Sequence, residues 1–175
     1  MTSDQIEPLR ATYLQMLAPA ASSGQRSEVS GQNFEVRELN NRDWKFNREM
    51  YFKVGANWKW IDKRPWTDEQ WKNYANDPNL RTFAGYSDGN VARYFELKRG
   101  VEDEIEIAYF GLLPEFIGRG LGGALLTSAI EKAWAWTPTP SRVWVHTCNR
   151  DHSSALANYQ ARGFQIYKVE SEARN

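Results

Sequence analysis

The chain has little that would tie it to an oxidising compartment, a membrane or a nucleic acid. It contains one cysteine, Cys148, which excludes an internal disulfide and favours a reducing cytoplasm. Basic and acidic residues balance at 22 each, so no charge excess indicates a nucleic-acid or polybasic membrane surface. No apolar run approaches the roughly 20 residues that cross a bilayer, and Met1–Leu9 lacks the regions of a signal peptide. We therefore expect a cytoplasmic protein without membrane or nucleic-acid partners.

A chain of 175 residues has the usual length of one domain and buries a substantial core without disulfides or metals. Its histidines, cysteine and carboxylates show no spacing typical of metal ligands, so no metal is expected. The eight Trp, eight Tyr and eight Phe are unusual, and several of them crowd between Trp44 and Tyr74. Core packing is one interpretation of that crowding, and an aromatic-walled pocket is the other.

The first segment differs in pattern from the rest of the chain. Apolar residues recur at helical spacing within Asp4–Leu17, which predicts an amphipathic helix that covers its own domain or a second copy of the chain. Ala20–Ser30 is small, polar and without period, as in a linker. We therefore expect an N-terminal helix and linker over residues 1–32 and a compact domain over residues 33–175, with a homodimer left open.

Alternation, helical spacing and turn residues divide the compact domain into strands and helices. Asn40 or Asn41 is expected to cap its first helix, and Thr67 with Gln70 forms a capping box for the second. The predicted order is strand Asn33–Leu39, a helix ending at Val54, a helix from Thr67 to Asn76, strands Leu80–Tyr86, Val91–Lys98 and Glu104–Leu112, helix Ala124–Trp134, strand Arg142–Thr147, helix Ser153–Arg162 and strand Phe164–Val169. This order predicts a mixed α/β sheet in which the strands flanking the third helix lie parallel.

Four glycines lie within six positions of the loop Leu112–Gly123, between a predicted strand and the next helix. The first N–H groups of a helix have no partner within it, and with the helix dipole they form a site for an anion such as a diphosphate. Arg119 adds a cation to the same loop. A tight turn with close packing of helix on strand is the purely structural interpretation.

Gly118, Gly120 and Gly123 fit the dinucleotide pattern G-x-G-x-x-G, but that fold places its first glycine directly after the strand and an acidic residue about 20 positions later. Here Pro114–Ile117 separate the glycines from the strand, and no acidic residue stands at that distance. No Lys-Ser/Thr pair follows, which excludes a Walker loop. A nicotinamide-dependent oxidoreductase is therefore the weaker alternative.

Two motifs in this half of the chain resemble the acetyl-CoA-binding region of the GNAT superfamily of N-acetyltransferases. The family signature Gln/Arg-x-x-Gly-x-Gly/Ala is similar to Ile117–Gly122, with isoleucine in the first place. Ala155–Phe164 resembles the family's later helix, Asn-x-x-Ala-x-x-x-Tyr-x-x-x-Gly-Phe, with His152 in place of the asparagine. The resemblance implies a mostly antiparallel sheet with helices on both faces and a splayed pair of parallel strands that holds the pantetheine arm.

The resemblance also implies which residues contact acetyl-CoA, the expected co-substrate. These residues are Leu112, Leu113, Ile117, Gly118, Arg119, Gly120, Leu121, Gly122, Gly123 and His152. The backbones of Leu112 and Leu113 would pair with the pantetheine arm as a neighbouring strand does. The Leu112 N–H would also polarise the thioester carbonyl, which makes it a catalytic group.

Glu106 is the expected general base, because it lies on the strand before the glycine loop where several family members carry a catalytic glutamate. Glu104, on the same face by the period of two, is the alternative base. Pairing of Glu106 with Lys98 or Arg93 is the structural interpretation. Tyr159 is the expected acid for the departing thiolate. These roles belong to direct attack of an amine on the thioester in a ternary complex.

The expected acceptor is a primary amine of a small molecule, bound by the two helices between residues 41 and 76. Trp44, Tyr51, Trp58 and Trp60 are the expected substrate-binding residues, and cation–π contact with a small cationic amine suits them. A protein lysine or N-terminus is the alternative acceptor. A catalytically silent CoA-binding module that regulates a partner is the alternative function.

Overall fold

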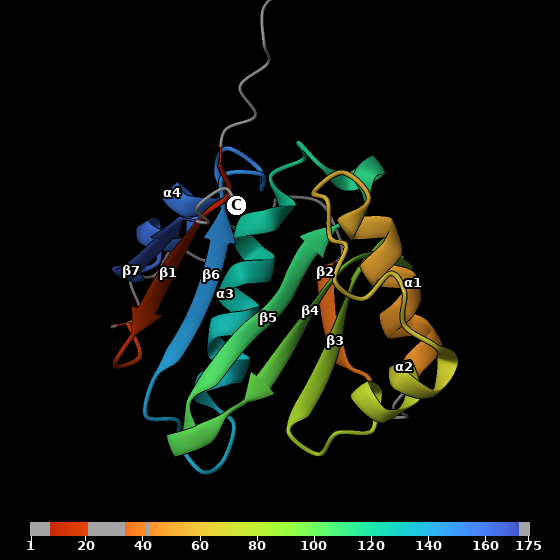
Figure 1. Ribbon diagram of the computed structural model, residues 1–175, viewed down its shortest axis with the longest axis horizontal. Helices are drawn as coiled ribbons and strands as arrows, with labels where there is room; N and C mark the ends of the chain where they lie inside the picture. The colour runs from red at the N-terminus through yellow and green to blue at the C-terminus, as the bar shows by residue number, and fades with distance from the viewer. Residues whose placement is uncertain (1–7, 21–33, 41–42, 172–175) are drawn as a thin grey trace, which may run out of the picture.

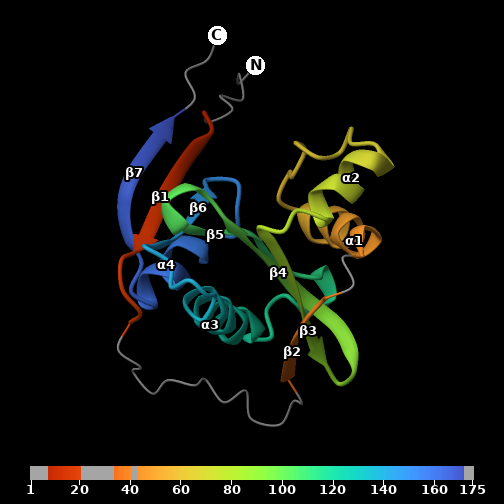
Figure 2. The ribbon, with the colours of Figure 1, turned by 90° about the horizontal axis from the view of Figure 1, so that it is seen from below.

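A computed structural model describes residues 8–20, 34–40 and 43–171 of the chain. Its main elements are β1 Arg10–Met16, β2 Phe34–Glu38, α1 Trp44–Gly55, α2 Asp68–Ala75, β3 Leu80–Ser87, β4 Asn90–Arg99, β5 Ile105–Leu112, α3 Leu121–Trp134, β6 Val143–Cys148, α4 Ala155–Ala161 and β7 Gln165–Ser171. The strands form one sheet in the order β2-β3-β4-β5-β6-β1-β7 (Figure 1). Helices α1 and α2 cover one face, and α3 and α4 cover the other (Figure 2).

The predicted mixed sheet is confirmed. All neighbouring strands pair antiparallel except β5 and β6, which run parallel around the crossover through α3. The predicted strands Leu80–Tyr86 and Val91–Lys98 correspond to β3 and β4, which form a hairpin. Asp88 and Gly89 both have positive φ, 48° and 81°, as a two-residue hairpin turn requires. Within the described ranges, no helix combines the length and the apolar character that a membrane span requires.

The predicted N-terminal helix over Asp4–Leu17 is wrong where the structure describes it. Residues Arg10–Met16 form β1, which lies between β6 and β7 and pairs antiparallel with both. Leu14 and Met16 are buried in the core, two positions apart, as one face of a strand requires. The apolar spacing of this segment fits a strand as well as a helix. Its pairing with distant strands on both sides makes it a strand. The predicted linker, apart from Ala20, lies outside the described residues.

The two helices on the α1–α2 face begin at polar caps. Asp43, not Asn40 or Asn41, caps α1, since its carboxylate accepts hydrogen bonds from the N–H groups of Lys45 and Phe46. Asn41 lies outside the described residues. For α2 the predicted capping box is confirmed, with Thr67 and Gln70 bonded to each other's backbone N–H.

Two apolar clusters hold the helices on the sheet. The larger one lies under α3 and α4 and includes Leu14, Leu125 and the stacked pair Phe83 and Phe95, whose ring centroids are 4.7 Å apart. The smaller one lies under α1 and joins Met50, Val54, Tyr94 and Leu113. Gly111 faces α1 so closely that a Cβ there would collide with Val54. The C-terminal half of α1 is thereby fixed beside the end of β5.

Candidate active site

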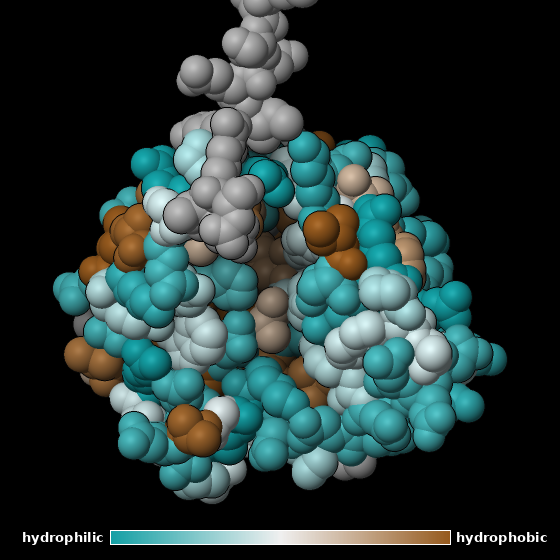
Figure 3. Space-filling model, in the orientation of Figure 1, coloured by the Kyte–Doolittle hydropathy of each residue, from teal (hydrophilic) through white to brown (hydrophobic). Residues whose placement is uncertain are grey.

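The parallel strands β5 and β6 separate soon after they meet. Their pairing covers Ile105 with Val143 and Glu106 with Trp144, although β5 continues to Leu112 and β6 to Cys148. Beyond that contact the two arrows diverge, with α3 visible behind the opening (Figure 1). The space-filling view shows a hollow at the same place, with apolar atoms at its floor (Figure 3). The predicted splayed pair is therefore present, and we call the opening the β5–β6 gap.

The backbone of Leu112 faces this gap. Leu112 stands opposite Arg93 on β4, and the Leu113 N–H donates to the Ala92 carbonyl at 2.8 Å. That bond makes the Leu112–Arg93 pair a non-hydrogen-bonded one, in which both backbone groups point away from the partner strand. The N–H and C=O of Leu112 therefore point toward β6. Leu113 is engaged within the protein instead, because its carbonyl also accepts a bond from the Phe116 N–H at 2.9 Å.

The glycine loop carries the chain from β5 to α3 at the open end of the gap. Gly118 and Gly120 have φ of 83° and 73°, values that favour glycine, and no atom lies within 4 Å of a Cβ placed on either. Gly120 is the N-cap of α3 and supplies no side-chain acceptor, so the first N–H groups of the helix keep no capping partner. Open space beside a bare helix N-terminus is a suitable cradle for a phosphate group.

The other loop residues have structural contacts. A Cβ on Gly123 would lie 2.5 Å from Nη2, at the flexible end of the Arg162 side chain. Gly122 lies against the Leu112 side chain, with 3.7 Å between its Cβ position and Cδ1. The exposed Arg119 stacks on Phe116, with Cζ 5.3 Å from the ring centroid. Ile117 and Leu121, the other two predicted cofactor residues of this loop, are half-buried and buried.

Glu106 lies where the gap opens. It stands opposite Lys98 in the register of β4 and β5, but the Lys98 ammonium pairs with Asp77 and the Glu106 carboxylate has His146 beside it. Oε1 of Glu106 is 3.4 Å from Nδ1 of His146 on β6. The side chain of Glu106 is 22% exposed and that of His146 is 46% exposed, so solvent reaches both. The carboxylate of Glu106 raises the pKa of His146 above its ordinary value, against the opposing effect of burial.

The alternative base, Glu104, is engaged elsewhere. Its Oε2 accepts a hydrogen bond from Nε of Arg142 at 2.8 Å and forms an ion pair with Nη2 at 2.7 Å. Lys98 binds Asp77, and Arg93 lies on the opposite face of the sheet. Of the two predicted glutamates, Glu106 is therefore the one without a cation of fixed charge bound to it in the described structure.

Tyr159 approaches the sheet from the other face. It is 7% exposed on α4 and packs between Phe110 and Phe164, with centroid distances of 6.5 and 5.9 Å. Burial raises the pKa of its hydroxyl, so the group stays protonated at neutral pH. Glu106 projects to the α1–α2 face, because its neighbours Ile105 and Ile107 point into the core beneath α3. The predicted base and acid therefore lie on opposite faces of the sheet.

The loop between α1 and α2 reaches across to the loop between β6 and α4. The rings of Trp58 and His152, a predicted substrate residue and a predicted cofactor residue, are 5.6 Å apart. Tyr51 and Trp60 form a second cluster with Tyr109 of β5, with centroids 5.0 to 5.6 Å apart. Three of the four predicted substrate-binding residues thus lie on the side of the sheet toward which Glu106 projects, with Tyr51 buried at 2% exposure.

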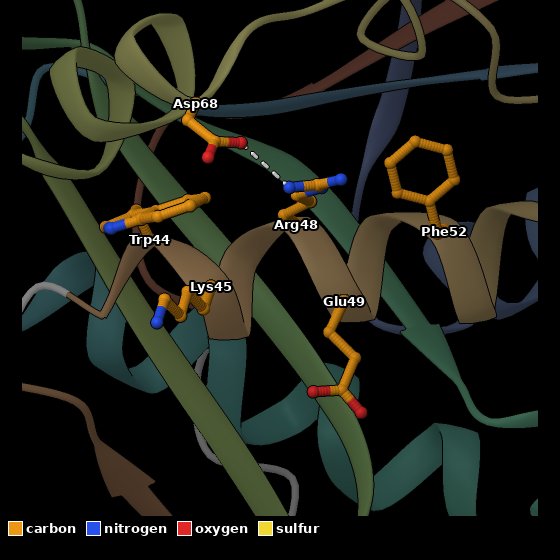
Figure 4. A pocket seen from close by; sticks show the side chains of 6 residues that line it. All are labelled: Trp44, Lys45, Arg48, Glu49, Phe52 and Asp68. Atoms are coloured by element: carbon orange, nitrogen blue, oxygen red, sulfur yellow. Dashed lines mark hydrogen bonds and ion pairs between the residues drawn. The ribbon is translucent and has the colours of Figure 1, made fainter.

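Trp44 is not part of these clusters. It begins α1, seven residues and about 10 Å of helix before Tyr51. There it helps to line a shallow surface pocket of about 390 Å³, together with Lys45, Arg48, Glu49, Phe52 and Asp68. Figure 4 shows the pocket between α1 and the start of α2, bridged by the Arg48–Asp68 ion pair at 2.9 Å. This pocket opens on the outer surface of the helices and not on the β5–β6 gap.

Sequence reasoning missed Asp62 and Lys63, which organise the aromatic cluster. Asp62 accepts hydrogen bonds from the hydroxyls of Tyr51 at 2.7 Å and Tyr109 at 2.9 Å. Burial raises the pKa of the Asp62 carboxyl, but the bonds from the tyrosines and the adjacent ammonium outweigh it and lower the pKa overall. These loop residues have no motif spacing, so only their position next to the predicted aromatics was a signal.

Lys63 occupies an aromatic cage of the kind that the sequence predicts for a cationic substrate. Its Nζ lies 4.4 Å from the ring centroid of Trp66 and 5.0 Å from those of Tyr74 and Tyr109, and 3.2 Å from Asp62. Its side chain is only 12% exposed. The best-formed aromatic cage on this face is therefore filled by an ammonium of the chain itself.

The gap, the free backbone edge of Leu112 and the uncapped N-terminus of α3 lie together, and these groups are of the kind that suit an extended ligand with a phosphate group. The sequence model described as the Acetyltransferase (GNAT) family matches residues 35–164. The chain belongs to this family. The family assignment and the predicted resemblance thus agree.

Curated relatives are named N-acetyltransferases, and solved structures share the fold. Uncharacterized N-acetyltransferases of Mycobacterium tuberculosis and Mycobacterium bovis are 30% identical over 93 residues, which is 53% of this chain and 58% of those proteins. The match thus spans little more than half the length of these curated relatives. A GCN5-related N-acetyltransferase from Sphaerobacter thermophilus superimposes with a TM-score of 0.65 at 15% identity, over 94% of this chain and 50% of that one.

Two further structures have acceptors in their names. One is described as IAA acetyltransferase from Bacillus cereus, with a TM-score of 0.60 and 20% identity over 78% of this chain and 79% of that one. The other is an aminoglycoside acetyltransferase from an uncultured soil metagenomic sample, with a TM-score of 0.61 and 14% identity over 82% of this chain and 99% of that one. At these identities the likeness shows the fold.

Proposed function

We propose that this protein transfers the acetyl group of acetyl-CoA to the primary amine of a small molecule, by direct attack in a ternary complex in the cytoplasm. One observation carries the proposal. The free backbone edge at Leu112 and the bare N-terminus of α3 lie at the two ends of one short loop, Leu113–Gly120, beside the β5–β6 gap. A strand-like arm that ends in a diphosphate fits both groups at once.

The residues fit coenzyme A in a specific way. The first N–H groups of α3, from Leu121 to Gly123, would bind the diphosphate, and the open sides of Gly118 and Gly120 leave room for it. Arg119 would add a charged contact at the exposed rim. Leu112 would pair with the pantetheine arm, while Ile117 and His152 would contact it through their side chains. Bound acetyl-CoA supplies the acetyl group as a thioester, which is the electrophile.

Glu106 would act as the general base for the amine. An alkyl amine with a pKa of about 10.4 is neutral in only about one molecule in 2,500 at pH 7, and only the neutral form attacks. Glu106 faces the acceptor side, is partly exposed to water and has His146 beside it. It would remove the amine proton directly or through one water, and the proton would then pass to solvent.

Leu112 would stabilise the charge that develops on the thioester oxygen, and Tyr159 would neutralise the charge on the departing sulfur. The Leu112 N–H points into the gap and would stabilise negative charge on the thioester oxygen. Tyr159, which burial keeps protonated, would donate its proton to the departing sulfur from the opposite face. Base and acid on opposite faces suit a reaction in which the amine enters from one side and the thiolate leaves toward the other.

The acceptor would lie among Trp58, Trp60 and Tyr51, on the face toward which Glu106 projects. The names of two structural neighbours, an IAA acetyltransferase and an aminoglycoside acetyltransferase, favour a small-molecule acceptor. The Asp62 side chain is 60% exposed, and its lowered pKa keeps it negatively charged, which suits an amine. Its charge and the aromatic walls together favour a small amine with an apolar body.

The test combines binding with turnover. Calorimetry should show that the wild-type protein binds coenzyme A, and a thiol-release assay with an amine panel should find an acceptor. Glu106→Gln should lower kcat/KM by about 100- to 10,000-fold while the Kd for coenzyme A stays unchanged. Glu104→Gln is the matched control, on the same face but held by Arg142, and should change kcat/KM by only a few-fold.

Tyr159→Phe should lower kcat with little change in KM for the amine. Binding of coenzyme A without turnover on any amine would favour a silent regulatory module. A folded protein with no affinity for coenzyme A would overturn the proposal altogether.

A further inference from the structure

Arg93 on β4 is a fully buried arginine. Its exposed fraction is 0%, and the space for its stem exists because residue 85 on the neighbouring strand is glycine. A Cβ on Gly85 would lie 2.5 Å from Cγ of Arg93. The guanidinium crosses over that glycine and stacks on Phe34 of β2, with Cζ 3.7 Å from the ring centroid. This packing places a charged group inside the layer between the sheet and α3.

The guanidinium is largely unpaired. Nη1 donates to the carbonyl of Leu121 at 2.7 Å, whereas Nε and Nη2 have no hydrogen-bond acceptor. No carboxylate of the described residues forms an ion pair with it, and burial alone lowers its pKa to about 10. Arg93 therefore stays a cation at neutral pH. A buried cation without a counter-ion is strongly unfavourable, so its presence calls for a function.

The single hydrogen bond of Arg93 ends at the first residue of α3. Its chain neighbour Ala92 accepts the bond from the Leu113 N–H at 2.8 Å. Two consecutive residues of β4 thus hold the two ends of the glycine loop, Leu113 and Leu121. The loop conformation and the position of the Arg93 charge are therefore coupled.

The first turn of α3 is already electropositive, because its N–H groups lack capping partners and the helix dipole adds partial positive charge there. Arg93 lies beneath this turn and increases the same field. The Arg93 cation and the partial positive charge of the helix N-terminus repel each other. A bound anion would relieve this repulsion. A diphosphate at the helix N-terminus would compensate both without contacting Arg93 directly.

We propose that Arg93 is a positioning residue for the diphosphate of coenzyme A, which holds the glycine loop through Leu121 and supplies a buried positive charge that the diphosphate neutralises. This inference rests on the proposed function. It assigns a role in anion binding to a residue on the sheet, outside the glycine loop and behind the gap.

The experiment compares two ligands that differ in the diphosphate. Kd values for coenzyme A and for pantetheine, which has no phosphate, are measured by calorimetry for the wild type, Arg93→Gln, Arg93→Lys and Arg93→Met. Gln keeps a donor for the Leu121 carbonyl without the charge, Lys keeps the charge, and Met keeps the stem alone. Arg48→Met, on the surface of α1, is the matched control. Circular dichroism confirms that each variant folds.

Arg93→Gln and Arg93→Met should weaken coenzyme A binding by about 10-fold or more, as expected for loss of a unit charge several Å from a diphosphate at an effective dielectric constant of about 20. Arg93→Lys should retain most of the affinity, and pantetheine should bind all variants alike. Without ligand, Arg93→Met should unfold at the wild-type temperature or above it, because an unpaired buried charge is gone.

Equal coenzyme A affinity of the wild type and Arg93→Gln would overturn the role of the charge. Equal losses in the Lys and Gln variants, or a parallel loss of pantetheine binding, would also overturn it, since they indicate a general distortion of the loop. If Arg93→Met does not fold, Arg93→Gln and Arg93→Lys still provide the comparison. Failure of the wild type to bind coenzyme A is a different result, which rejects the proposed function instead.

Discussion

Glu106 and His146 face each other at the point where β5 and β6 part, with 3.4 Å between Oε1 and Nδ1. The carboxylate raises the pKa of the imidazole above its ordinary 6.5. In the proposed reaction Glu106 is the base, so protonation of His146 would affect both the stability of this contact and the approach of an amine.

The first prediction concerns stability. Because the pKa of His146 is higher in the folded chain, the folded protein binds its proton more tightly. The resulting stabilisation is fully present below pH 6.5 and is lost as pH rises through the folded pKa. His146→Gln should therefore reduce the free energy of unfolding more at pH 6 than at pH 8.5. The difference should stay below about 1 kcal/mol, since the pair is partly exposed.

Urea unfolding of both proteins across this pH range measures the effect. A difference that grows with pH would contradict the assigned contact. His152→Gln is the matched control, because His152 hydrogen-bonds Ser154 rather than a carboxylate.

The second prediction separates glycine as a conformational requirement from glycine as a ligand cradle. Gly120 and Gly89 have φ of 73° and 81°, and both have open space at the Cβ position. Alanine at either residue should destabilise the fold by a similar amount, about 1 kcal/mol, because of backbone strain. Only Gly120→Ala should also weaken coenzyme A binding. Equal effects of both variants on the Kd would contradict an anion site at α3.

Much of this arrangement is predictable from the sequence, because it depends on local signals. The capping box at Thr67, the hairpin at Gly89 and the positive φ of Gly118 and Gly120 all follow from residues close together in the chain. The expectation for Tyr159 likewise rests on a local pattern, the motif Ala155–Phe164. Such features need no knowledge of distant partners.

The remaining features depend on contacts between distant residues. β1 was mistaken for a helix, since its partners on β6 and β7 lie 127 or more positions away in the chain. The orientation of the Leu112 backbone depends on the pairing register of β4 and β5, which slips at Glu96 and Leu97. Trp44 was grouped with Tyr51 by composition, although it stands at the other end of the helix. Tertiary pairing decides each of these cases.

The third prediction concerns a buried carboxylate on the acceptor side. Glu96 is 1% exposed, and it accepts hydrogen bonds from the Tyr74 hydroxyl and from the Asn47 amide at 2.7 Å. Burial raises the pKa of Glu96, and the tyrosine opposes that rise. Tyr74→Phe leaves one carboxylate oxygen without its donor and should destabilise the fold by about 1–3 kcal/mol at pH 7.

The pH dependence has a definite sign. Loss of the hydroxyl moves the folded pKa of Glu96 further above its unfolded value. The deficit of Tyr74→Phe should therefore be smallest near pH 4.5 and should increase as the pH rises toward 7. Tyr86→Phe is the control, because the Tyr86 ring stacks on Arg37, and should change stability by less than about 0.5 kcal/mol. A constant deficit across this range would argue against the Glu96 contact.

The last prediction concerns the cage around Lys63. Its ammonium contacts Trp66, Tyr74 and Tyr109 and pairs with Asp62, while only 12% of the side chain is exposed. Lys63→Ala should lower the free energy of unfolding by about 1–2 kcal/mol, because three aromatic faces and a carboxylate lose their cation. It also leaves an empty cage that suits an alkylammonium ion in size and in charge.

Added propylammonium should therefore restore part of the stability of Lys63→Ala, whereas 1-propanol, of similar size but neutral, should not. Wild-type protein should gain nothing from either compound. Lys72→Ala is the matched control, because its ammonium lies 5.5 Å from the Trp44 ring at an exposed position, and no rescue is expected. Equal rescue by alcohol and ammonium would show that the cage selects volume rather than charge. Rescue by the ammonium alone would show that this side of the protein binds protonated amines wherever its own lysine is absent.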